Sequence, residues 1–403
     1  AVGTAFPVTF MVTAVAFGLS NGAAVIVGQS FGSGKKERIK RIITICVWYA
    51  VAVSLLLSVI CYLLSPFLLK IINASPEIYD DALTYLRVYF VGLIFTFTYN
   101  MISSIFRALG DSKTPLIFLG VASVVNIVLD LFFVLQFGWG VFGVAVATVI
   151  AQGLSFLLQA IFLGIRLKHF SELEKQGPEL PEDYNKQVMK SLMTVAIPST
   201  MQEFTIGINI FIAQALVNLF GADATGAYAA CGKIENFAMM PMINASIAMT
   251  SYTAQNMGAG KSERVVTGRK YALGFTVAVA AMIGSLVVFF PRGLMMIFLG
   301  PNTPEAVFTI GEGYLRVMAI TVIEMAFLFS TEGVLRGSGD VKCLIWFAVA
   351  SMVTKVSVSV SLIYIFNMGI NSVWIGSVCS WGIEMIMSLY RYRSGKWKSI
   401  NMN

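Results

Sequence analysis

Long stretches of this sequence carry no charged side chain, and this feature constrains the fold more than any other. Four of them cover residues 1–34, 42–69, 88–106 and 139–165. A helix needs about 20 apolar residues to cross a bilayer, so each stretch can span. Charged residues make up only 12% of the chain and hydrophobic residues 57%, whereas soluble domains carry roughly 25% charged residues. We therefore predict a polytopic membrane protein.

Most of the remaining apolar segments are interrupted by one to three charged residues. The predicted fold is an all-α polytopic membrane protein. We expect eleven helices, over residues 6–31, 42–69, 84–106, 114–136, 140–165, 191–220, 231–256, 271–290, 313–335, 343–367 and 372–390.

The net charge of +7 is a topology signal. If the loop after the first helix is cytoplasmic, that side holds most of the 28 basic residues, whereas the opposite loops are short and mostly acidic or neutral. Cytoplasmic loops retain Lys and Arg. The basic excess therefore indicates a bilayer partner and no nucleic acid. We expect a multi-pass protein of the plasma or inner membrane, a monomer, with both termini of the intact chain cytoplasmic.

The sequence contains a long internal repeat, the kind of signal that sets an architecture. Three segments return at nearly one offset, of 226 residues for the first and 229 for the others: Gln29–Arg38 as Gln255–Arg264, Tyr85–Val88 as Tyr314–Val317, and Arg107–Lys113 as Arg336–Lys342. The basic loops of both halves fall on one side, so the halves are parallel repeats.

We predict three regions: an N-terminal lobe of five helices at 1–165, a cytoplasmic linker at 166–190, and a C-terminal lobe of six helices with a basic tail at 191–403. The apolar helix at 191–220 precedes the segment that aligns with Ala1. Its counterpart in the first half would lie upstream of Ala1. We therefore expect twelve helices, six plus six, in the intact chain.

The paired Gln-x-x-Gly-x-Gly-Lys-x-x-Arg loops, the Arg-x-x-Gly-Asp loops, the Asn126–Asp130 segment and the ending Arg391–Trp397 resemble the multidrug and toxic compound extrusion (MATE) transporters of the prokaryotic DinF-like type. The resemblance covers nearly the whole chain. It implies export of organic, often cationic, compounds by alternating access, in exchange for H⁺ or Na⁺.

Asp130 is the charged residue that we most expect to have a function. A carboxylate within a span costs about 2.5–3.5 kcal/mol on insertion scales, so it faces a polar interior or is protonated. Asn126 lies one turn earlier on the same face, and Thr148 on the next helix can add an oxygen. The resemblance implies that these three residues form a cation site, together with an Asp on the helix upstream of Ala1. The alternative is a buried Asp that only fixes helix packing.

A second group of intramembrane charges lies in the other half: Glu203, Glu324 and Lys355. A buried Lys needs a counter-ion, and the two carboxylates are candidates. A static salt bridge and a role in coupling or substrate attraction are both open. The repeat places Lys355 and Ser359 where the first half has Asn126 and Asp130, so the halves are chemically unequal.

The sequence favours a transporter over an enzyme, with no catalytic residue, no organic cofactor and no metal beyond a possible Na⁺ at Asp130. The segment Gly258–Ser262 is similar to the end of a phosphate-binding loop, but the required upstream Gly is Gln255. A gradient must then supply the energy, and a small organic compound is the expected substrate. Two alternatives stay open: a lipid-linked oligosaccharide flippase of related fold, and a channel or membrane scaffold.

Overall fold

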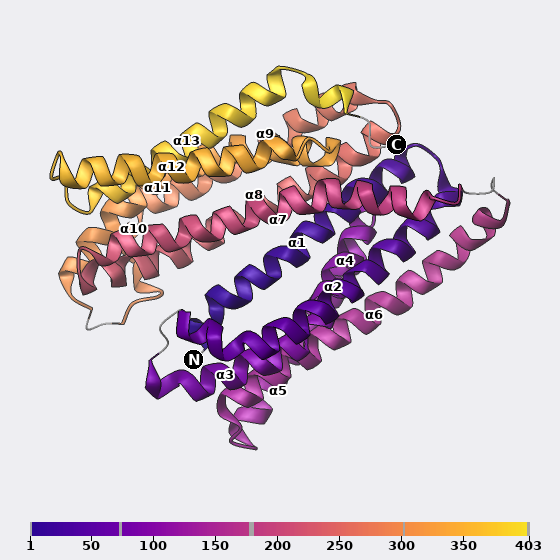
Figure 1. Ribbon diagram of the computed structural model, residues 1–403. Coiled ribbons are helices and arrows are strands. Elements are labelled where there is room, and N and C mark those ends of the chain that lie inside the picture. Colours follow the sequence, from indigo (N-terminus) through magenta and orange to yellow (C-terminus); the bar gives the residue numbers. More distant parts are fainter. Residues whose placement is uncertain (1, 72–74, 177–180, 301–302, 401–403) are drawn as a thin grey trace. The chain divides into compact units, whose positions relative to one another are not determined.

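The computed structural model describes residues 2–71, 75–176, 181–300 and 303–400 (Figure 1). These ranges contain α-helices and no β-strand, which confirms the all-α prediction. The helices are α1 (Val2–Gly32), α2 (Lys36–Ile71), α3 (Pro76–Val91), α4 (Leu93–Ala108), α5 (Lys113–Leu135), α6 (Gly140–Gln176), α7 (Tyr184–Asn218), α8 (Ala222–Gly258), α9 (Ser262–Phe289), α10 (Pro291–Met296), α11 (Glu305–Ser338), α12 (Lys342–Tyr364), α13 (Asn371–Arg393) and the short 3₁₀ helix η1 (Lys396–Ser399).

Most of the predicted membrane spans are present. Among the described residues, 8 helices are long and apolar enough to cross a bilayer, and up to 9 if α3 and α4 form one bent span. The predicted spans at 191–220 and 231–256 fall outside this set. Their helices, α7 and α8, are 35 and 37 residues long, so length is sufficient. Polar side chains such as Glu203 and Glu235 lower their hydropathy.

The backbone repeats the pattern found in the sequence. Gly110 and Gly339, 229 residues apart, both have a positive φ, of 86° and 90°. Each donates its N–H to the carbonyl of the arginine three residues earlier, Arg107 or Arg336, at 3.0 Å. Glycine adopts this left-handed conformation without steric cost and so ends a helix. A positive φ also recurs at three other pairs of repeat positions: Gly34 and Gly260, Gly138 and Asn367, and Gly140 and Gly369.

The chain divides into two compact units, Ala1–Glu203 and Phe204–Asn401. The division falls inside α7, and not between α6 and α7 where the sequence places the linker. Residues 177–180 of that linker lie outside the described residues. The predicted boundaries at 166–190 stay a prediction.

The core of the first unit lies among α1, α2, α3 and α4. Ile39, Leu86, Phe97 and Met101 are among its fully buried side chains. The beginning of α7 packs onto the same core through Leu192. This explains why the first part of α7 belongs to this unit.

The sequence predicts one helix at 84–106, and the structure corrects this to two. α3 and α4 meet at Gly92 with a bend of 50°. A Cβ atom at Gly92 would lie 2.5 Å from Val149 of α6, so α6 approaches the break closely. The Ser58 hydroxyl of α2 donates to the carbonyl of Phe90, which satisfies a backbone group beside the break.

The second unit has a continuous helix where the first unit has the break. α11 runs through Thr321, which the repeat aligns with Gly92. Its core contains Leu315, Met325 and Trp374 with residues of α8 and α9. Gly333 lets α11 approach α8 closely, because a Cβ there would lie 2.6 Å from the carbonyl oxygen of Ser246.

Candidate cation site

The helix pair α5 and α6 carries the predicted site in the first unit. Their aromatic side chains meet at Phe118 and Phe162, with ring centroids 4.9 Å apart. At the other end, the rings of Phe133 and Trp139 stack at 5.0 Å. A Cβ at Gly143 would lie 2.9 Å from the Cβ of Phe133. These contacts fix the two helices against each other and thereby set the position of Asp130.

Asp130 and Asn126 both keep a buried atom without a hydrogen-bond partner among the described residues. These atoms are Oδ1 of Asp130 and Nδ2 of Asn126. Buried polar atoms in native proteins nearly always have a partner, and an exception calls for an explanation such as a functional role or an ion. The side chains are half-buried, at the edge of an α5 face that exposes Ile127, Val128 and Leu131.

Thr148 on α6 is half-buried and donates its hydroxyl hydrogen to the carbonyl of Val144 at 2.9 Å. Because the hydrogen is engaged, the hydroxyl oxygen has lone pairs to offer. The structure describes no direct bond between Thr148 and Asp130. The grouping of Asn126, Asp130 and Thr148 as a cation site therefore remains a prediction.

Tyr85 is a neighbour of this site that the sequence reasoning did not identify. It lies on α3, within electrostatic range of the Asp130 carboxylate. Its ring stacks on Tyr89 with centroids 6.2 Å apart. The Tyr89 hydroxyl is 3.0 Å from Oγ1 of Thr13 on α1. The signal was present in the sequence, because Tyr85 opens one of the repeated segments, but only the fold brings it near Asp130.

The chemistry of this donor set is limited to small cations. It offers one carboxylate and neutral hydroxyl and amide oxygens. Hard oxygen ligands bind hard cations, and divalent ions usually take several carboxylates. The described residues contain no group of three or more His, Cys, Asp or Glu side chains that could hold a metal ion. A proton or a weakly held monovalent cation fits this set best.

The predicted charge cluster of Glu203, Glu324 and Lys355 is distributed over the fold. Glu203 ends the first unit, whereas Glu324 and Lys355 belong to the second. Glu324 of α11 lies against Gly382 of α13, because a Cβ added at Gly382 would be 3.0 Å from Oε1 of Glu324. Lys355 is buried on α12 and interacts electrostatically with Glu235 of α8. The clustering of the three predicted residues stays a prediction.

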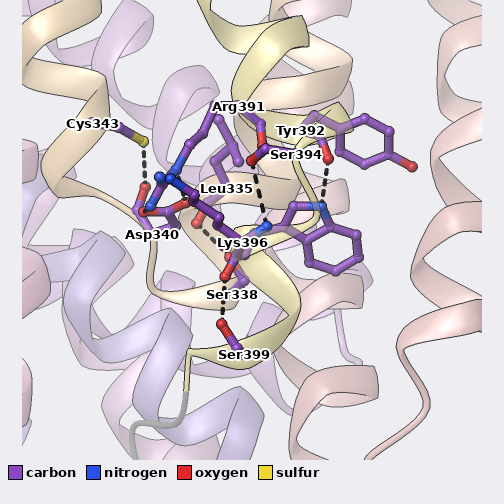
Figure 2. A network of polar contacts seen from close by, with 10 residues as sticks. Leu335, Ser338, Asp340, Cys343, Arg391, Tyr392, Ser394, Lys396 and Ser399 are labelled. Atoms are coloured by element: carbon purple, nitrogen blue, oxygen red, sulfur yellow. Dashed lines mark hydrogen bonds and ion pairs between the residues drawn. The ribbon is translucent and has the colours of Figure 1, made fainter.

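The two Arg-x-x-Gly-Asp loops are held in similar ways. Asp340 accepts two hydrogen bonds from Arg391 of α13, from Nε at 2.7 Å and from Nη2 at 2.9 Å (Figure 2). In the first unit, Asp111 accepts from the backbone N–H and hydroxyl of Thr114, at 3.0 and 2.8 Å. Arg166 of α6 lies 3.6 Å from the same carboxylate. Each loop is thus tied to the last long helix of its repeat.

Asp111 lies in the loop between α4 and α5, outside the spans. Partial burial acts to raise its pKa, but the two bonds from Thr114 and the charge of Arg166 act in the other direction. The net result is a pKa below the usual value. The carboxylate is therefore the form that the folded loop stabilises.

The comparisons with known proteins agree with this architecture. A family model described as MatE matches residues 1–132 and 198–361. The probable multidrug resistance protein YpnP of Bacillus subtilis is 27% identical, over 98% of this chain and 86% of its own length. The probable multidrug resistance protein YoeA of the same species is 24% identical, over 99% of this chain and 86% of its own. NorM of Thermotoga maritima, also named a probable multidrug resistance protein, is 24% identical over 98% and 85%.

Solved structures show the same fold. One describes the outward-facing conformation of a multidrug resistance MATE family transporter of the MOP superfamily. It matches with a TM-score of 0.89 at 20% identity, over 98% of this chain and 88% of that chain. A MOP superfamily transporter from Pyrococcus furiosus matches with a TM-score of 0.90 at 20% identity, over 99% and 88%.

Proposed function

Because this chain belongs to the MatE family of multidrug efflux transporters, we propose that it is a secondary active antiporter. It exports organic compounds, many of them cationic, in exchange for H⁺ or Na⁺ by alternating access between its two halves. Its family consists of transporters and not of enzymes, and the chain is a multi-span membrane protein.

The single observation that carries the proposed coupling is the Asp130 carboxylate. Its Oδ1 is buried without a hydrogen-bond partner among the described residues. A carboxylate within a span costs about 2.5–3.5 kcal/mol on insertion scales. Binding a proton or a monovalent cation removes most of that cost. Asn126, Thr148 and Tyr85 supply the polar surroundings. The arrangement of these side chains that is favoured with a bound cation therefore differs from the one that is favoured without it.

The energetics are sufficient for export. One charge that moves through 100 mV releases about 2.3 kcal/mol, which supports a substrate gradient of roughly fiftyfold. Exchange of one cation for one monovalent cationic substrate cancels this electrical contribution. The chemical gradient of the coupling ion then drives export.

The setting follows from the same proposal. The protein acts as a monomer in the plasma or inner membrane, with the termini of the intact chain in the cytoplasm. It needs no organic cofactor, because the coupling ion supplies the energy. The positive-inside distribution of Lys and Arg supports this orientation.

The test is efflux of a fluorescent organic cation from vesicles that contain the full-length protein and an imposed ion gradient. Asp130→Asn should abolish gradient-driven efflux while the protein remains inserted and still binds the dye. Asp81→Asn is the matched control, because Asp81 is an exposed carboxylate on α3 and undergoes the same chemical change. Full efflux by the Asp130→Asn variant would make Asp130 a packing residue.

A further inference from the structure

The internal repeat places a second set of residues at the positions of the candidate cation site. A shift of 229 residues takes Tyr85, Asn126, Asp130 and Thr148 to Tyr314, Lys355, Ser359 and Ser377. The hydroxyls of Thr148 and its counterpart Ser377 make the same kind of hydrogen bond. Ser377 donates to the carbonyl four residues earlier at 3.1 Å, as Thr148 does at 2.9 Å. The second unit therefore has a structural counterpart of the site, with a different charge.

Lys355 brings a positive charge to this counterpart. Its side chain is 9% exposed, and the described residues offer its ammonium group no hydrogen bond and no ion pair within 4 Å. Ser359, one turn further along α12, is fully buried, and its Oγ has no partner in the same part of the chain. A Cβ at Gly376 of α13 would collide with that Oγ and lie 3.1 Å from the carbonyl oxygen of Lys355. α13 thus closes the position tightly.

Glu235 of α8 supplies the opposite charge. Tyr314, which is bonded to Glu235, packs edge to face on Trp374 of α13, and two residues later α13 meets the Lys355 carbonyl at Gly376. The Glu235 carboxylate is therefore on the Lys355 side of the unit, and its charge acts on the ammonium group from beyond ion-pair distance. The Tyr314 hydroxyl donates to Oε2 of Glu235 at 2.6 Å, which orients the carboxylate. Glu235 has another lysine two residues earlier, Lys233, but this side chain does not neutralise it. Lys233 is exposed, and its Nζ lies 5.5 Å from the centroid of the Phe298 ring.

Aromatic rings enclose the Glu235 side of this position. Tyr314 and Trp374 meet edge to face with centroids 4.6 Å apart, and Tyr228 stacks on Trp374 at 5.9 Å. Tyr314 and Trp374 are buried. Charges enclosed by apolar side chains interact more strongly than charges in water. The Glu235 carboxylate therefore offsets part of the cost of burying the Lys355 ammonium group.

The two units differ in one respect that decides their ion chemistry. In the first, the Asp130 carboxylate has no Lys or Arg partner among the described residues, so a cation from solution can bind there and be released. In the second, the cation is part of the chain, and its counter-charge comes from a neighbouring helix. We propose that the Lys355 ammonium is a tethered cation that fills the second unit's counterpart of the cation site, with Glu235 as its counter-charge. The consequence for transport, that only the first unit exchanges a cation, rests on the proposed function.

The test removes the tethered cation from the purified full-length protein. Lys355→Met leaves Glu235 uncompensated, so we expect a lower melting temperature and a new stabilisation by Na⁺. That stabilisation is measured at alkaline pH against choline at equal ionic strength. Adding Glu235→Gln should restore at least half of the lost melting temperature and abolish the new response to Na⁺. Lys355→Arg is the charge-retaining control, and it should show no new response.

The outcomes separate clearly. If Lys355→Met melts like the wild type, or if the two substitutions lower the melting temperature additively without a response to Na⁺, the tethered cation is refuted. If Lys355→Met cannot be recovered folded, recovery of the Lys355→Met/Glu235→Gln protein supports the proposal and its loss overturns it. Repeating the series with Asp130→Asn removes any response from the first unit. The melting temperatures of that series then report on the second unit alone, even if Asp130 has no part in transport.

Discussion

Gly333 gives the sharpest test of the packing between α8 and α11. A Cβ at this position would lie 2.6 Å from the carbonyl oxygen of Ser246 and 2.8 Å from the Cβ of Met249. Ordinary contacts begin at about 3.5 Å, so Gly333→Ala requires a movement of nearly 1 Å. A backbone carbonyl cannot rotate away, so one helix must shift. Overpacking of this kind costs about 1–3 kcal/mol.

The gain in helix propensity from Gly to Ala, about 0.8–1.0 kcal/mol, acts in the opposite direction. Gly313→Ala is the matched control, because it lies on the same helix and its Cβ would meet nothing within 4 Å. The difference between the two variants isolates the packing cost of about 1–3 kcal/mol.

The assay is thermal unfolding of both variants in detergent, followed with a thiol-reactive fluorophore. Cys46 and Cys231 are fully buried and free, so they react when the protein opens. Gly333→Ala should melt below Gly313→Ala. If the two variants melt together, the close approach of α8 and α11 does not exist in the protein, and the argument fails.

Three further predictions concern other contacts. Asp111→Asn should be less stable than wild type at neutral pH. The lowered pKa of Asp111 means that its contribution is complete above the unfolded-state pKa of about 4 and is lost at lower pH, so acid titration of both proteins should bring the unfolding curves together. Arg391→Lys keeps the charge but loses the two-pronged bond to Asp340, which should cost about 1.5–3 kcal/mol in the same melting assay. Gly92→Ala should lower the melting temperature through its clash with Val149, and Gly92→Ala/Val149→Ala should recover it; failure of that rescue would refute the contact.

The sequence predicted the helices because their signal is local. An uncharged stretch of 20 or more residues has one stable form in a bilayer. The repeat was also visible, since the loop residues that end helices recur at one spacing, and Gly110 and Gly339 indeed share a positive φ. The break at Gly92 was missed because the flanking residues are as apolar as those of a continuous span. Only the close approach of Val149 on α6 marks it.

The candidate site was predicted only in part. Asn126 and Asp130 lie one turn apart on a single helix, so spacing alone places them together. Tyr85 is 45 residues away in the sequence, and it lies near Asp130 because α3 and α5 both pack against α6. For Lys355 of the second unit, the sequence offered Glu324 and Glu203 as counter-ions. The structure instead places Glu235 of α8 in electrostatic range of Lys355, through Tyr314 of α11 and Trp374 of α13.

By itself, the sequence determined that this chain crosses a membrane as helices, that its halves are repeats, and that one half carries Asp130 where the other carries Ser359. These properties follow from the cost of charge in hydrocarbon and from local helix geometry, and both act along the chain. Only the tertiary structure decided which charges face each other, where a span breaks, and which buried oxygen lacks a partner. These depend on contacts between helices, and a contact between helices has no fixed spacing in sequence.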